Sequence, residues 1–129
     1  MSLRVVESVG STLIQDAGRP GLSAWGVGPS GVFDRRAFRQ VNTLLGNPEY
    51  AAVIEHFGGP LSLLATREHA VVVSGALGPV TLDGVPASVG EVVIMPAHSI
   101  LRVGPAVVGL RFLIGVAGGI DVPAVLHSR

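Results

Sequence analysis

Short runs of apolar residues, interrupted by glycine, proline and polar residues, occupy most of the chain. The runs are three to seven residues long and rich in valine, isoleucine and leucine, which is typical of β-strands. A Gly10-Ser11 turn and an Asp83-Gly84 hairpin turn are expected between neighbouring runs. The pattern predicts strands at 3–6, 12–15, 52–57, 61–65, 70–74, 80–82, 85–87, 92–95, 99–103 and 110–116.

One segment has helical rather than strand periodicity. Phe38, Val41 and Leu45 recur at the spacing of a helix face. Asp34 is a favourable N-cap, and Gly46 is a favourable residue just beyond the last turn. We therefore predict a single domain over residues 1–129, mainly β, a barrel or sandwich of short strands with one α-helix at about 34–46.

Composition narrows the function classes. Nine basic and nine acidic residues give a formal net charge of zero, so no electrostatic attraction to nucleic acid or to an anionic membrane is expected. The chain has no cysteine, and all nine cationic residues are arginine. Thiolate nucleophiles, disulfides, Schiff bases and biotin-attachment lysines are therefore excluded.

Neither membrane insertion nor secretion is indicated. The longest stretches without a charged residue have 14 residues and contain glycine, whereas a membrane-spanning helix needs about 20 apolar residues. The first residues lack the charged start and apolar block of a secretory signal. We expect a cytoplasmic protein.

Polar residues gather at the end of the second predicted strand. Asp16 and Arg19 either form an ion pair in a turn or line a polar pocket together with Gln15. In the second case, Gln15 would hydrogen-bond an amide or ureido group and Arg19 would hold a carboxylate.

Two further acids have two interpretations each. Asp34 is either the N-cap of the helix or a catalytic acid. Glu55 lies in an apolar run and, if it faces inward, is either a structural buried acid or a general base.

The loop before the helix contains GVGPSG at 26–31, which matches the letters of a dinucleotide-binding fingerprint. A buried strand before it and alternating β and α elements are missing, so we expect an ordinary loop or an anion-binding one. The four histidines have no spacing that indicates a metal site.

Several segments together resemble a known family. They are TLIQDAGRPG at 12–21, GVGPSGVFD at 26–34, LGNP at 45–48, Gly109-Leu110-Arg111, and AGGIDVP at 117–123. This set resembles the N-terminal part of the allophanate hydrolase subunit 2 family, whose members are also described as KipA-like proteins or as the 5-oxoprolinase C-subunit.

The resemblance implies a largely β, cyclophilin-like fold. It implies part of a carboxyltransferase-like subunit that acts on a urea-like or 5-oxoproline-like amide together with a subunit-1 (KipI-like) partner, in a homo- or hetero-oligomer. Biotin on a separate carrier, or ATP, would come through partners, with no covalently bound cofactor here. The expected catalytic residues are Asp16, Asp34 and Glu55, and the expected substrate-binding residues are Gln15, Arg19, Ser30, Gly31 and Asn47, with no metal ligands.

Two other functions stay open at this point, so enzymatic activity is not assigned. A KipA-like protein can be a regulatory module that antagonises a kinase inhibitor, which predicts a flat apolar surface without a cleft. Alternatively, the chain is an inactive fragment without its C-terminal half. The enzymatic hypothesis predicts that polar residues of 15–19 and 30–34 share one cleft.

Overall fold

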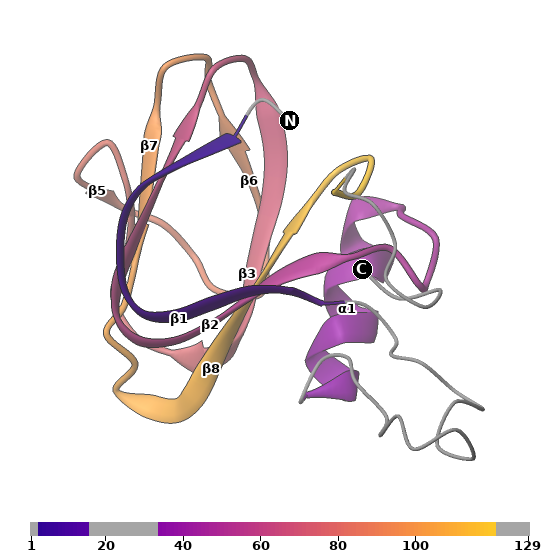
Figure 1. Cartoon of the computed structure of the whole chain (residues 1–129). Helices are drawn as coiled ribbons and strands as arrows, with labels where there is room; N and C mark the ends of the chain where they lie inside the picture. The colour runs from indigo at the N-terminus through magenta and orange to yellow at the C-terminus, as the bar shows by residue number, and fades with distance from the viewer. Residues whose placement is uncertain (1–2, 16–33, 121–129) are drawn as a thin grey trace.

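A computed structural model describes residues 3–15 and 34–120 and shows a curled β-sheet with one helix against its outer side (Figure 1). The elements are β1 (Leu3–Gln15), α1 (Arg35–Leu45), β2 (Val53–Ala65), β3 (His69–Leu77), β4 (Val80–Leu82), β5 (Val85–Pro86), β6 (Val92–Met95), β7 (Ile100–Val103) and β8 (Val108–Val116). The mainly β fold with one helix is confirmed. No helix in these residues is long and apolar enough to cross a membrane.

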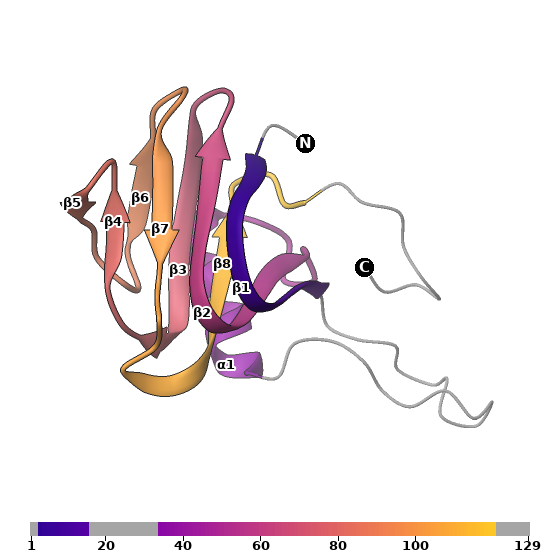
Figure 2. The same ribbon diagram turned by 60° about the vertical axis from the view of Figure 1, so that its left-hand side comes forward.

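The eight described strands form one antiparallel sheet with the order β5-β4-β7-β2-β8-β3-β6, and β1 pairs with β2 beside this path. The first half of β2 pairs with β8, and its second half pairs with β7. On its other edge, β2 pairs with β1 over almost its whole length. The change of partner occurs where β2 bends, and the sheet curls around its own inner face (Figure 2).

The inside of the curl is the main hydrophobic core. Seven of the eight described strands contribute buried side chains to it, so the core is shared by segments far apart in the sequence. Its largest fully buried members include Ile54, Leu61, Leu63, Met95, Leu101, Phe112 and Ile114.

Helix α1 packs on the outer face of the sheet over a second, smaller core. Phe38 and Val41 of the helix contact Val53, Val72 and Leu113 of three strands. The predicted ends of the helix are confirmed. The N–H of Ala37 donates to Oδ1 of Asp34 at 3.0 Å. Gly46 takes the left-handed conformation that ends helices, with φ of 68°.

One predicted turn and one predicted break between strands are wrong. The expected Gly10-Ser11 turn lies inside the single strand β1, and the expected break at 58–60 lies inside the single strand β2. The reason is that Gly10 and Gly58 face each other across this strand pair. A Cβ on Gly10 would lie 2.2 Å from the carbonyl oxygen of Phe57, so glycine permits two sharply bent strands to stay paired.

The other predicted strands occur near their expected limits. The Asp83-Gly84 hairpin between β4 and β5 is confirmed, with φ of 49° and 81° at its two turn residues, as a type I′ turn requires. The loop that contains GVGPSG lies outside the described residues.

Candidate functional site

A row of side chains crosses four strands on the face that carries the helix. Leu13 of β1, Glu55 of β2 and Leu113 of β8 are paired in register, and Ser74 of β3 follows Leu113. The hydroxyl of Ser74 donates to Oε1 of Gln40 on α1 at 2.9 Å, which ties this row to the helix. The Ser74 end of the row is therefore hydrogen-bonded to α1.

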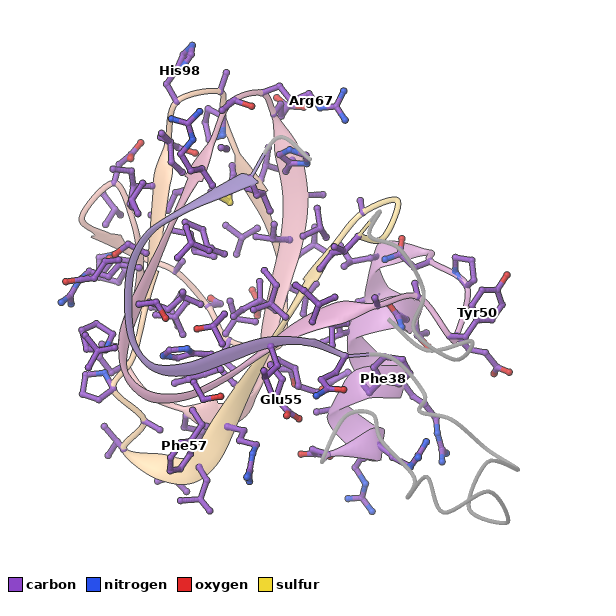
Figure 3. All side chains as sticks on the ribbon, viewed as in Figure 1. Phe38, Tyr50, Glu55, Phe57, Arg67 and His98 are labelled. Carbon is purple, nitrogen blue, oxygen red and sulfur yellow. The ribbon has the colours of Figure 1, made fainter. Side chains whose placement is uncertain are left out.

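Glu55 is buried, but it does not point into the main core. Successive side chains of β2 point to opposite faces of the sheet. Val53 belongs to the core under the helix, and Ile54 belongs to the core inside the curl. Glu55 shares the face of Val53 and is 7% exposed. Glu55 is therefore buried on the outer face of the sheet, the face that carries α1, and not on the inner face (Figure 3).

The next row on the same face brings in a residue that the sequence did not single out. Arg111 of β8 pairs with Phe57 of β2, and its guanidinium carbon lies 5.4 Å from the centroid of the Phe57 ring. This distance is within the range of a cation–π contact. Arg111 is also the diagonal neighbour of Glu55, a relation in which Cβ atoms are roughly 7–8 Å apart.

A pocket of about 270 Å³ opens where the start of α1 meets the ends of β3 and β8. Among the described residues, two charged ones line it, Asp34 and Arg111. Glycine is required in its wall, because a Cβ on Gly75 would lie 2.5 Å from the carbonyl oxygen of Arg111. In the described part of the chain, the lining is Asp34, Gly75, Ala76, Gly109, Leu110 and Arg111.

The pocket chemistry combines one hydrogen-bond acceptor with one rigid, planar donor. Asp34, which lines the pocket, uses Oδ1 to cap the helix, and this bond restrains its carboxylate. Arg111 is half-buried and held against Phe57, so its guanidinium is oriented as well. Such a pair can accept an N–H and donate to a carbonyl or carboxylate of one small molecule.

One signal in the sequence could have identified Arg111. Gly109-Leu110-Arg111 belongs to the segments that carry the family resemblance, but its neighbours in the chain are apolar and form no local polar cluster. Arg111 is separated from Asp34 by 77 positions, and no spacing along the chain indicates that they meet.

Asn47, an expected substrate-binding residue, lies at the opposite end of α1 from Asp34. Its side-chain N–H donates to the carbonyl oxygen of Val116 at 2.9 Å, and its Oδ1 accepts from the N–H of Gly118 at 2.8 Å. These bonds clamp the loop after α1 to the end of β8. Its role in binding stays a prediction, because the structure shows only this clamp.

Gln15 ends β1 on the helix side of the sheet. It pairs with Val53, whose side chain packs under α1. Asp16, Arg19, Ser30 and Gly31 lie outside the described residues, so the predicted convergence of 15–19 with 30–34 stays a prediction. Within residues 3–15 and 34–120, no three acidic or histidine side chains gather in a group that could hold a metal ion.

Comparison with known proteins gives consistent matches. The family described as carboxyltransferase domain, subdomain A and B, matches residues 25–129. The chain is 36% identical over 120 residues to urea amidolyase of Lachancea kluyveri, which covers 92% of this chain and 6% of that protein. It is 32% identical over 126 residues to the 5-oxoprolinase C-subunit of Escherichia coli, which covers 98% of this chain and 41% of that protein.

A solved structure shows the same fold. The crystal structure of the Kluyveromyces lactis urea carboxylase matches with a TM-score of 0.91 and 34% identity, over 98% of this chain and 11% of that chain. The present chain therefore spans less than half the length of each of these relatives.

Proposed function

Because the chain belongs to the carboxyltransferase domain family, subdomains A and B, we propose that it supplies part of a binding site for a small amide in a carboxyltransferase-like assembly. Membership confirms the resemblance to the 5-oxoprolinase C-subunit and related proteins.

The observation that carries the proposal is the pairing of Asp34 with Arg111 in one pocket. Urea and 5-oxoproline, which give two relatives their names, both contain a carbonyl next to an N–H. The Arg111 guanidinium can donate to the carbonyl or to a carboxylate, while the Asp34 carboxylate accepts the N–H. A volume of about 270 Å³ is of a size that suits such small compounds.

The surface beside the pocket supports completion of the site by another chain. Leu77, Val107, Val108 and Leu110 lie around its β3 and β8 ends, and each is more than half exposed. Leu77 pairs with Val108, and the N–H of Val107 donates to the carbonyl oxygen of Leu77, so three of them form one continuous patch. We propose that a subunit-1 (KipI-like) chain packs here.

Biotin on a separate carrier, or ATP, would reach the assembly through that partner or a further one. This chain has no lysine and so cannot carry biotin covalently. Asp34 and Arg111 would bind and orient the amide substrate. Asp34 and Glu55 would be the acidic residues nearest to it.

The proposal is tested by titrating the labelled protein with 5-oxoproline and with urea and monitoring its ¹H–¹⁵N NMR spectrum. We expect shifts at the amides of Gly75, Gly109 and Leu110. Arg111→Gln should weaken 5-oxoproline binding by about 1.5–3 kcal/mol, the range for a hydrogen bond to a charged group. 2-Pyrrolidinone keeps the lactam of 5-oxoproline and lacks its carboxylate. Its binding therefore separates donation by Arg111 to the carbonyl from donation to the carboxylate.

Arg102→Gln is the matched control, because Arg102 is an exposed strand arginine outside the pocket that pairs with Glu7 at 3.4 Å. Equal losses in both variants, or shifts confined to other amides, would contradict the proposal. Thermal melting of each variant shows whether the fold is kept.

A regulatory, KipA-like function is the second candidate, and the same apolar patch favours it. It predicts binding of a subunit-1 (KipI-like) chain that is lost on Val108→Glu, with no small-molecule binding at the pocket. The inactive-fragment hypothesis predicts neither kind of binding.

A further inference from the structure

The curled sheet does not close on itself in the described residues. β5 and β6 are the two ends of the strand order, and they are joined along the chain by residues 87–91. A cavity of about 550 Å³ is lined by residues of both strands and of the segment that joins them. Its lining is Leu82, Asp83, Val85, Pro86, Ala87, Ser88, Glu91, Val92, Val93 and Pro96.

The floor of this cavity, here called the seam cavity, is apolar. Leu82, Ala87 and Val93 are partly buried and pack against the main core. A ligand with an apolar body would thus extend the core across the opening, and burial of its apolar surface would favour binding.

The charges of the seam cavity are all negative. Asp83 and Glu91 line it, and no arginine or histidine does among the described residues. Glu91 is exposed and forms no ion pair with the described residues. A neutral or anionic ligand would leave these carboxylates uncompensated, whereas a cation complements both.

Asp83 is held in one orientation. Its Oδ1 accepts from the N–H of Ile100 at 2.8 Å, and its own N–H donates to the carbonyl oxygen of Ile100 at 2.9 Å. Its positive φ belongs to the hairpin turn. These bonds restrain the exposed Asp83 side chain, so less of its conformational freedom is lost when a ligand binds.

We propose that the seam cavity binds a small organic monocation, an amine or amidinium group on an apolar body. The apolar part lies on Leu82, Ala87 and Val93, and the cation lies between the carboxylates of Asp83 and Glu91. This site is separate from the Asp34–Arg111 pocket and does not depend on the function proposed for that pocket.

The probe is benzamidine, compared with benzamide, which has nearly the same shape and no charge. In NMR titrations of the labelled protein at low salt, benzamidine should shift the amides of Asp83, Glu91 and Val93. Benzamide should bind at least about fivefold more weakly, and the difference should shrink at high salt.

Glu91→Gln and Asp83→Asn test the two carboxylates. Asparagine tolerates the positive φ and still accepts from Ile100, so the turn is preserved. Each variant should weaken benzamidine binding roughly two- to fivefold, with no change for benzamide. Glu49→Gln removes an exposed carboxylate elsewhere on the molecule and should leave both affinities unchanged.

Three results would overturn the proposal: equal affinity for benzamidine and benzamide, benzamidine shifts that map elsewhere, or full affinity in the Asp83→Asn/Glu91→Gln double variant. Because Glu91 is exposed, its variant gives a clear answer even if the change at Asp83 alters the hairpin.

Discussion

Nδ1 of His56 lies 2.7 Å from the hydroxyl oxygen of Thr12, its partner across β1 and β2. The other ring nitrogen, Nε2, lies 2.6 Å from the carbonyl oxygen of Gly59. A carbonyl only accepts, so Nε2 donates there, and in the neutral ring Nδ1 accepts from Thr12. His56 is 1% exposed, so these two bonds hold a polar ring inside the bend of β2.

Thr12→Val should destabilise the protein by about 1–3 kcal/mol, because a buried acceptor on His56 loses its donor while the side-chain shape is kept. Urea unfolding measures the change. Ser8→Ala is the control. Ser8 is exposed and bonds Thr12 at 2.7 Å, so its loss should cost much less. Equal costs for the two variants would contradict the assigned role of Thr12.

The cap at Asp34 predicts a contrast between two substitutions. Asp34→Ala should lower the free energy of unfolding by about 0.5–2 kcal/mol, whereas Asp34→Asn should have little effect, because asparagine also accepts from the N–H of Ala37. Thermal unfolding of both variants is the measurement. A large loss of stability in Asp34→Asn would show that the negative charge of Asp34, and not only its hydrogen bond, stabilises the protein.

Gly115 lets α1 lie close to β8. A Cβ there would be 2.0 Å from Cγ1 of Val41 and 2.9 Å from Cδ1 of Leu45, so Gly115→Ala should cost about 1–3 kcal/mol through overpacking. Val41→Ala removes the obstructing methyl group. The Gly115→Ala/Val41→Ala double variant should therefore lose less stability than the sum of the singles. Additive losses in urea unfolding would disprove the contact.

Stability should depend on pH through His69. Burial, and secondly the charge of nearby Arg67, lower the pKa of His69 from its ordinary value of 6.5. The unfolded chain then binds this proton more readily than the folded chain does. The free energy of unfolding should decrease as the pH falls from above 6.5 through the lowered pKa, and His69 adds no further change below it.

His69→Gln should remove this decrease, and Arg67→Gln should reduce it. Urea unfolding between pH 7.5 and 5 measures both. A wild-type and a His69→Gln protein with the same pH dependence would refute the assignment.

Local signals in the sequence were sufficient for the helix and for one hairpin. Asp34 caps through Ala37, three residues away, and Asp83-Gly84 makes its turn within four residues. Both depend on atoms close along the chain, so residue type alone predicts them. The turn predicted at Gly10 and the strand break predicted at 58–60 are wrong, because a glycine between two apolar runs looks the same in a turn and in a bend of a paired strand.

The candidate site was decided by the tertiary structure. Strand alternation places Glu55 on one of two faces, but the sequence around it is apolar on both, because α1 covers the outer face as the curl covers the inner one. Asp34 and Arg111 line one pocket only because β8 pairs with β3 and the helix packs on these strands. The sequence determined which residues carry chemistry, and the pairing of distant strands determined which of them share a pocket.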